Sequence, residues 1–155
     1  MTASPTYTER LGVPLRWWVQ GTMLVATLWL AVVVAVPGPA AWVVTAIALA
    51  GLFGGLWSYG NPRISVDGAT FRAGRAHIAA GYVGAATALD ADQTRRTAGR
   101  EADARAYLML RPYLKRAVRV EILDPADPTP YWLVSSRRPE ELARALTALG
   151  QSVRG

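Results

Sequence analysis

The sequence predicts a membrane α-helical hairpin of two transmembrane helices, followed by a small α+β domain that is mostly antiparallel β and ends in a helix. Two observations carry this prediction. Residues 17–62 contain no Asp, Glu, Lys, Arg or His, and they are interrupted once, at Pro37-Gly38-Pro39. Residues 63–155 instead show short alternating segments, which are typical of strands, and then one amphipathic segment, which is typical of a helix.

Residues 1–16 form a polar leader in which Pro5 and Pro14 limit regular structure. We expect a cytoplasmic arm at the membrane interface. A signal peptide is the alternative, because basic residues precede an apolar run. The run is longer than a usual signal core and lacks a small-residue cleavage site followed by polar sequence, which favours a retained anchor.

The apolar span consists of two blocks, residues 17–36 and 40–59, of twenty residues each. A helix rises ~1.5 Å per residue, so about twenty residues cross a hydrocarbon core of roughly 30 Å. Each block therefore predicts one membrane-spanning helix, and the Pro-Gly-Pro segment predicts a tight turn between them.

The charges at the ends of the span predict its orientation. Arg10 and Arg16 precede the first block, Arg63, Arg72 and Arg75 follow the second, and the connecting turn has no charge. Positive residues stay on the cytoplasmic side of a membrane. We therefore expect a multi-pass protein of the plasma (inner) membrane with both termini in the cytoplasm.

Small residues recur at helical spacing in both blocks. Thr27, Ala31 and Ala35 repeat every four residues in the first, and Gly51 and Gly55 form a small-xxx-small pair in the second. Such positions let helix backbones approach closely in lipid. The pattern favours packing within the hairpin, with homo-oligomer contact as the alternative. Neither block contains an ionisable residue, so a proton or ion path has no candidate.

Short strands follow the span. Residues 64–66 and 70–71 predict a β-hairpin, because the intervening Asp67-Gly68 suits a tight turn. Residues 76–89 are apolar but too short to span a bilayer, and they predict one or two strands.

The next segment, residues 90–99, predicts a short helix capped by an aspartate. Residues 107–111, 117–123 and 131–135 predict three further strands, and the second of them alternates valine or isoleucine with charged residues. The Asp- and Pro-rich run at 124–128 predicts a rigid turn between the last two strands.

A C-terminal helix is predicted over residues 139–149. Pro139 suits the first helical position, two glutamates follow in the first turn, leucines repeat on one face, and Gly150 comes after the last of them. About seven strands followed by one helix resemble the element order of a pleckstrin-homology-like barrel with its capping helix.

Five segments carry a resemblance to a known family: YTERL at 7–11, GREADAR at 99–105, RPY at 111–113, DPADPTPYWLVS at 124–135 and RRPEEL at 137–142. The chain resembles an actinobacterial family of membrane proteins with two amino-terminal membrane helices, which is classified as a domain of unknown function. The resemblance implies a membrane location and assigns no catalytic or ligand residue.

The composition limits the possible chemistry. The chain has no cysteine, and His77 is its only histidine, which argues against disulfides, thiolate nucleophiles and common zinc sites. Nucleophile-elbow, P-loop and dinucleotide-binding patterns are absent. We therefore predict no catalytic residue, no cofactor and no metal, and we expect a non-enzymatic protein. Basic and acidic residues are interleaved, so we expect no nucleic-acid partner.

One candidate recognition surface surrounds the proline-stiffened turn. A rigid loop could present several polar and aromatic side chains together to a partner. The alternative is that these residues build the turn, pack beneath it or pair locally. A second alternative is a membrane-bound enzyme that uses the carboxylates of the turn, with a divalent ion. The candidate residues are Asp124, Asp127, Tyr131, Trp132, Arg137 and Arg138.

A stretch of basic residues without intervening acids is a second candidate surface. It consists of Arg111, Lys115, Arg116 and Arg119. Such residues attract anionic headgroups by about 1 kcal/mol per well-placed charge. The alternative is a solvated strand edge.

These observations lead to one main expectation. The hairpin anchors a cytoplasmic pleckstrin-homology-like module that binds a protein partner or anionic lipid headgroups at the bilayer. A membrane-bound enzyme and a small accessory subunit of a larger membrane complex are the alternatives.

Overall fold

The computed structural model describes residues 6–36 and 38–154 and divides into two compact units. The first, which we call the sheet unit, comprises the chain up to Leu11 and from Pro62 onward. The second, which we call the hairpin unit, is Gly12–Asn61. The hairpin unit is thus inserted into the sequence of the sheet unit.

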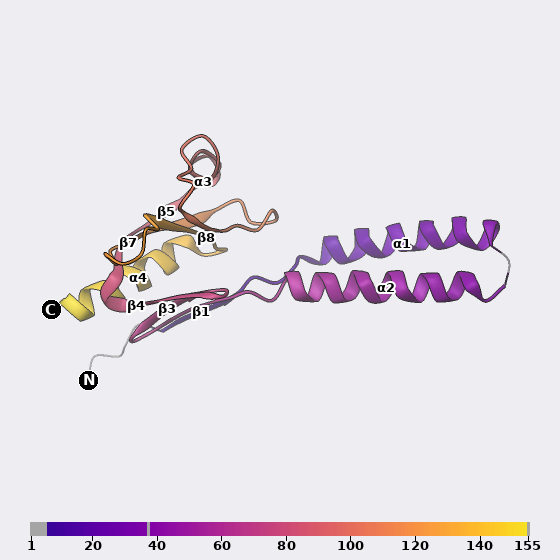
Figure 1. Cartoon of the computed structure of the whole chain (residues 1–155), viewed down its shortest axis with the longest axis horizontal. Helices are drawn as coiled ribbons and strands as arrows, with labels where there is room; N and C mark the ends of the chain where they lie inside the picture. Colours follow the sequence, from indigo (N-terminus) through magenta and orange to yellow (C-terminus); the bar gives the residue numbers. More distant parts are fainter. Residues whose placement is uncertain (1–5, 37, 155) are drawn as a thin grey trace. The chain divides into compact units, whose positions relative to one another are not determined.

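The hairpin unit consists of α1 (Leu15–Ala35) and α2 (Ala40–Tyr59), which lie antiparallel and side by side (Figure 1). Pro14 and Pro39 stand directly before the two helices, where a missing N–H costs no helical hydrogen bond. Both helices are long and apolar enough to cross a membrane, and only 6 % of the most apolar window of each is buried. The two apolar helices predicted from the sequence are confirmed.

Gly21 of α1 lies against Leu52 of α2. A Cβ atom built at Gly21 would lie 2.8 Å from Cδ1 of Leu52 on α2, which is closer than real side chains approach. Aromatic pairs lie on both sides of this contact. The rings of Trp18 and Phe53 are 5.1 Å apart, and those of Trp29 and Trp42 are 5.6 Å apart.

The small residues predicted to pack within the hairpin do not form this contact. A Cβ atom built at Gly51 or Gly55 would meet nothing within 4 Å, and Thr27, Ala31 and Ala35 are exposed. Because both helices are apolar on all sides, the spacing of small residues did not indicate which face would meet the other helix.

The sheet unit begins with a four-stranded antiparallel sheet in the order β1-β2-β3-β4. Its strands are β1 (Tyr7–Arg10), β2 (Arg63–Asp67), β3 (Thr70–Ala73) and β4 (Ala76–Ala79). A short 3-10 turn, η1 (Ala80–Tyr82), leads to the second sheet.

Strand β1 corrects the expectation that residues 1–16 form an arm. Residues 6–11 belong to the sheet unit, and β1 pairs along its whole length with β2. The strand has only four residues, and a glutamate, Glu9, occupies one of its two inward positions. A hydrophobic alternation is therefore not visible in the sequence. Residues 1–5 lie outside the described part of the chain.

The second sheet has the order β5-β7-β8-β6. It contains β5 (Val83–Leu89), β7 (Ala117–Ile122), β8 (Tyr131–Ser135) and β6 (Tyr107–Met109). Strand β6 pairs in parallel with β8, whereas the other pairs are antiparallel. The mostly antiparallel α+β class is confirmed. Within the described residues the strands form two separate sheets and no closed barrel, so the predicted pleckstrin-homology-like barrel is not confirmed.

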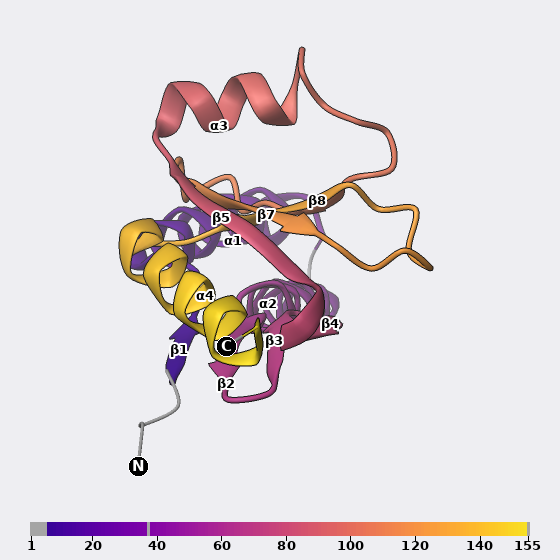
Figure 2. The same ribbon diagram turned by 90° about the vertical axis from the view of Figure 1, so that its left-hand side faces the viewer.

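Two helices complete the sheet unit, α3 (Ala91–Ala98) and α4 (Pro139–Arg154). Figure 2 shows them on different sides of the β5-β7-β8 strands. The C-terminal helix is confirmed and extends beyond its predicted end, because Gly150 does not terminate it. A Cβ atom at Gly150 would lie 3.1 Å from the carbonyl oxygen of Val83, so this glycine lets α4 approach β5.

The core lies between the two sheets and α4. Phe71 of the first sheet and Trp132 of the second are both buried, with ring centroids 5.6 Å apart. Leu142 and Leu146 of α4 are fully buried in the same cluster. A smaller cluster on the other face of the second sheet contains Leu89, Ala117, Tyr131 and Leu133.

The helix contact of the hairpin unit makes a first prediction. Leucine at Gly21 must displace Leu52, and such overpacking typically costs about 1–3 kcal/mol. Leucine at Gly51 enters open space and should change the stability of the hairpin by less than about 0.5 kcal/mol. The full-length variants can be compared by titration from a mild detergent into dodecyl sulfate, followed by near-UV circular dichroism of the tryptophans. Equal dodecyl sulfate midpoints for the Gly21 and Gly51 variants would contradict the contact between Gly21 and Leu52.

Candidate functional site

The two aromatic residues of the candidate recognition surface are structural. Tyr131 and Trp132 are 4 % and 5 % exposed and lie in different core clusters. The Tyr131 hydroxyl accepts a hydrogen bond of 3.1 Å from the backbone N–H of Asp103. The Arg119 guanidinium lies 4.5 Å from the centre of the Tyr131 ring. Neither aromatic ring offers a free face to a partner.

The two aspartates of that surface build the turn before β8. Asp124 Oδ1 accepts a hydrogen bond of 2.9 Å from the N–H of Ala126, and Asp127 Oδ1 accepts one of 2.9 Å from the N–H of Thr129. The hydrogen bonds from Thr129 hold the pKa of Asp127 below its ordinary value. Among residues 6–36 and 38–154, no three His, Asp or Glu residues are grouped so that they could hold a metal ion.

The arginines of the same candidate surface lie elsewhere. Arg137 and Arg138 follow β8, whereas Asp124 and Asp127 precede it, so β8 separates the two pairs. Arg138 pairs with Glu141 at 3.1 Å in the first turn of α4. The structure therefore does not bring the six predicted residues together on one surface.

The four basic residues predicted to form a second candidate surface have different surroundings in the structure. Arg116 pairs with Glu140 at 3.2 Å and donates a hydrogen bond of 3.0 Å to the carbonyl of Arg137. Arg119 stacks on Tyr131, as described above. Lys115 is exposed and Arg111 is half-buried.

The loop that carries Arg111 and Lys115 is fixed to the end of β1. The hydroxyl of Tyr113 donates a hydrogen bond of 2.7 Å to the carbonyl of Leu11, the last residue of the sheet unit before the hairpin unit. Leu11 in turn donates its N–H to the carbonyl of Pro62 at 3.3 Å. The two links to the hairpin unit therefore begin at neighbouring residues, and this basic loop lies beside them.

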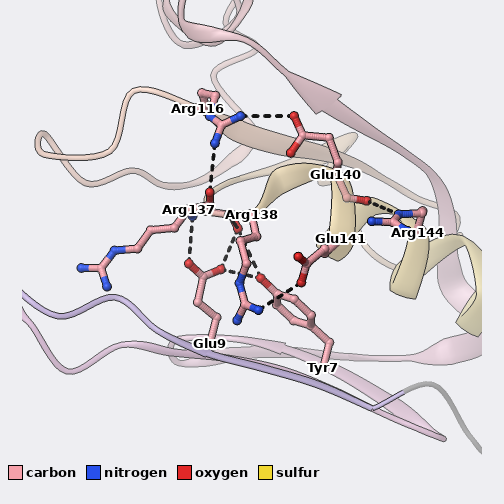
Figure 3. A network of polar contacts seen from close by, with 9 residues as sticks. Tyr7, Glu9, Arg116, Arg137, Arg138, Glu140, Glu141 and Arg144 are labelled. Atoms are coloured by element: carbon pink, nitrogen blue, oxygen red, sulfur yellow. Dashed lines mark hydrogen bonds and ion pairs between the residues drawn. The ribbon is translucent and has the colours of Figure 1, made fainter.

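A buried carboxylate joins β1 to the start of α4 (Figure 3). Glu9 is 5 % exposed. Its Oε2 atom accepts hydrogen bonds from the hydroxyls of Tyr7, at 2.7 Å, and Ser136, at 2.6 Å. Its Oε1 atom accepts one from the N–H of Arg137 at 2.8 Å. Both oxygens are therefore occupied by donors of the protein itself.

The same network continues into α4. Ser136 Oγ accepts a hydrogen bond of 3.0 Å from the N–H of Arg138, whose guanidinium lies 5.5 Å from the centre of the Tyr7 ring. Anionic groups are favourable near a helix N-terminus, where N–H groups lack helical partners. Burial of Tyr7, with a further contribution from the Glu9 carboxylate, raises the pKa of its hydroxyl to about 12.

The outer face of the β1-β4 sheet carries a group of exposed arginines. Along each strand, buried residues alternate with exposed ones. In the register of the sheet, Arg10 lies directly opposite Arg63. One row further along the strands, Arg72 lies between Ser65 and His77.

From the sequence alone, these arginines indicate only the orientation of the apolar span in a membrane. The alternation of Ile64 and Val66 with Arg63 and Ser65 was a visible signal that Arg63 faces outward. The position of Arg10 opposite Arg63 was not visible, because β1 was not predicted and the hairpin unit of fifty residues lies between β1 and β2 in the sequence.

Comparisons with known proteins add one finding. A family model described as "Protein of unknown function (DUF3093)" matches residues 6–146, which is most of the chain. No curated protein and no solved structure matches.

The Tyr7 hydroxyl makes a prediction about alkaline pH. The ordinary pKa is 10.0 and the folded value is about 12, so the folded state binds the proton more tightly than the unfolded state. This contribution is complete below pH 10 and is lost as the pH rises from 10 to 12, by about 2 kcal/mol in the free energy of unfolding. Tyr7→Phe should cost about 1 kcal/mol at pH 7, through the lost bond to Glu9, and should flatten the decline above pH 10.

Urea unfolding of the full chain in a neutral detergent, followed at a series of pH values, measures both effects. Tyr82→Phe is the matched control, since the Tyr82 side chain is 43 % exposed. If the free energy of unfolding declined equally steeply between pH 10 and 12 in the wild type and in Tyr7→Phe, the Tyr7 hydroxyl would not be the group responsible for the decline.

Proposed function

Since the chain belongs to the DUF3093 family, whose function is unknown, we propose a function on physical grounds alone. The protein is an integral membrane protein whose α1–α2 hairpin crosses the bilayer. The sheet unit faces the cytoplasm and acts by binding, without catalysis. The observation that carries this proposal is the exposed apolar surface of the hairpin unit.

Water is a poor solvent for this surface. Large apolar side chains project from both helices, including Val34, which is 81 % exposed, and Trp57, which is 73 % exposed. Exposed apolar area disfavours the aqueous state by about 25 cal/mol per Å². A core helix of a soluble protein would be largely buried, whereas only 6 % of the most apolar window of each of these helices is buried within the described structure. A hydrocarbon environment removes the penalty.

Strand β1 supports the retention of α1 as an anchor. Cleavage after a signal sequence would remove every residue before the cut, including β1. That strand supplies Tyr7 and Glu9 to the interior of the sheet unit and pairs with β2 along its full length. Loss of β1 would leave the backbone hydrogen-bonding edge of β2 unpaired and the Ser136 hydroxyl and Arg137 N–H without Glu9 as their acceptor.

Binding fits the sheet unit better than catalysis does. Its buried carboxylate, Glu9, is held by three donors of the protein. The turn carboxylates Asp124 and Asp127 each accept a backbone N–H within their own turn. Exposed arginines, in contrast, are available on the outer face of the β1-β4 sheet. Because these arginines are positively charged, the partners that suit this face are anionic groups.

A second candidate function is assembly with another membrane helix. Gly51 and Gly55 face open space on α2 rather than α1, and such positions permit close helix contacts in lipid. Gly51→Leu should then dissociate a co-purifying partner or a homo-oligomer while the hairpin itself stays intact. Unchanged assembly by blue-native electrophoresis would count against it.

The proposed topology predicts where a cysteine at the helix turn can be labelled. Ala40 is the better site, because Gly38 has a positive φ of 97° that other residues adopt only with strain. In intact cells, Ala40→Cys should react with a membrane-impermeant maleimide added from outside. The wild type is a clean background, since it has no cysteine.

The matched control is Ala79→Cys, an exposed position at the end of β4. It should react only after the cells are permeabilised. Labelling of Ala79→Cys in intact cells, or of Ala40→Cys only after permeabilisation, would overturn the orientation.

A further inference from the structure

We infer that the outer face of the β1-β4 sheet binds anionic phospholipid headgroups of the membrane in which the hairpin is anchored. This inference rests on the membrane anchoring proposed above and adds the surface and the class of ligand. The residues of the face that carry positive charge are Arg10, Arg63 and Arg72, with Arg75 in the adjoining β3–β4 turn.

The arrangement of the first two arginines favours an anionic ligand. Arg10 and Arg63 are exposed and occupy directly opposite positions on β1 and β2. Side chains in such positions start about 5 Å apart, and like charges there destabilise a sheet. Neither arginine forms an ion pair with a residue among 6–36 and 38–154. A phosphate group between them would replace this repulsion with two charge-assisted contacts.

The next row across the sheet supplies further donors. In register, Thr8 lies opposite Ser65, Ser65 opposite Arg72, and Arg72 opposite His77. Hydroxyl and guanidinium groups are the usual hydrogen-bond donors to phosphate oxygens. This row therefore has the chemistry of a headgroup-binding surface across the full width of the sheet.

Charge on this face changes in a regular way along the strands. The row with Arg10 and Arg63 lies next to the links to the hairpin unit and carries two positive charges. The acid Asp67 lies at the opposite end, where it pairs with Thr70. The positive end of the face is thus the end from which the chain continues into the membrane hairpin.

Chain length keeps these arginines near the bilayer in any orientation of the sheet unit. Arg10 precedes the start of α1 at Leu15 by five residues, and Arg63 follows the end of α2 at Tyr59 by four. An extended chain spans at most ~3.6 Å per residue, so each Cα lies within about 18 Å of a helix end. Headgroup regions add roughly 5–8 Å to each side of the hydrocarbon core, and an arginine side chain covers part of the remaining distance. Anionic lipids are therefore within reach.

A fluorescent label on this face tests the inference in the full chain. Thr8→Cys, labelled with an environment-sensitive nitrobenzoxadiazole dye, is placed in the exposed second row. The protein is reconstituted into vesicles of phosphatidylcholine alone or of phosphatidylcholine and phosphatidylglycerol in equal parts. We expect a blue shift of the emission in the anionic vesicles that decreases in high salt. The same label at Gln151, an exposed residue of α4, should show no such shift.

Paired variants identify the residues. Each arginine near an anionic surface contributes about fivefold to the equilibrium, so Arg10→Gln with Arg63→Gln should reduce the ratio of docked to undocked states by about 25-fold. The matched control is Arg96→Gln with Arg100→Gln, which removes the same charge from exposed positions in and just after α3. An equal loss in both double variants would overturn the assignment to this face.

The stability of the same variants gives a second readout. Removal of one of two facing guanidinium groups should raise the urea midpoint of Arg63→Gln in a neutral detergent, while the lipid response falls. A variant that merely misfolds would show a lower urea midpoint as well as a weaker lipid response. A lowered midpoint would overturn the inference that Arg10 and Arg63 repel each other in the absence of lipid.

Alkaline washing of the vesicles separates failure of this inference from failure of the anchoring proposal. If the chain stays in the vesicles and the label shows no phosphatidylglycerol-dependent shift, only the headgroup-binding inference fails. If the wash releases the chain, the anchoring proposal fails and this inference falls with it. If an added single-stranded oligonucleotide shifts the emission of the label and phosphatidylglycerol does not, the ligand of this face is nucleic acid and not lipid.

Discussion

The pairing of β1 with β2 is the constraint on which the arrangement of this chain depends. Fifty residues of the hairpin unit separate the two strands, and closing so long a flexible loop costs about 3 kcal/mol more than a two-residue turn. The helices offset this cost, because their antiparallel packing brings the ends of the hairpin unit together. At Gly60 an added Cβ would lie 3.1 Å from the backbone nitrogen of Val13. Once the two helices have packed together, the hairpin unit joins β1 and β2 in the same way that a short turn joins neighbouring strands.

Glu9 determines how β1 pairs once it is in place. A slip of one residue would turn Glu9 outward and Arg10 inward, because side chains alternate between the faces of a strand. At the inward position the Ser136 hydroxyl and the backbone N–H of Arg137 donate hydrogen bonds to Glu9. A guanidinium group carries donors only and cannot accept these bonds. A buried carboxylate is costly unless it is fully paired. The network therefore contributes to the choice of register as well as to the contact between β1 and α4.

The sequence predicted the parts of the fold whose periodicity is long enough to be visible. The two apolar helices, the antiparallel strands and the C-terminal helix belong to this class, and so does α3, whose predicted aspartate cap is Asp90. It did not predict β1, where four residues with an inward glutamate show no hydrophobic pattern. It also did not predict that Tyr131 and Trp132 would be buried on opposite faces of β8, because all five residues of that strand are buried and alternation is lost. The resemblance to a domain of unknown function was confirmed over residues 6–146, and it assigned no functional residue.

Most local features of the sheet unit stabilise its fold. The pair of arginines that face each other across β1 and β2 is an exception. Turn residues, helix caps and inward side chains each stabilise the element in which they occur, whereas Arg10 and Arg63 place like charges directly opposite each other, an arrangement that typically destabilises a strand pair. Such conflicts in natural proteins tend to occur at functional sites, where stability is lower than the fold would allow. Here the conflict lies beside the links to the apolar hairpin, and an anionic bilayer surface would remove it. On the inference that these arginines bind a headgroup phosphate, membrane binding and strand pairing would be coupled, since the bound phosphate would stabilise the pairing that holds both links together.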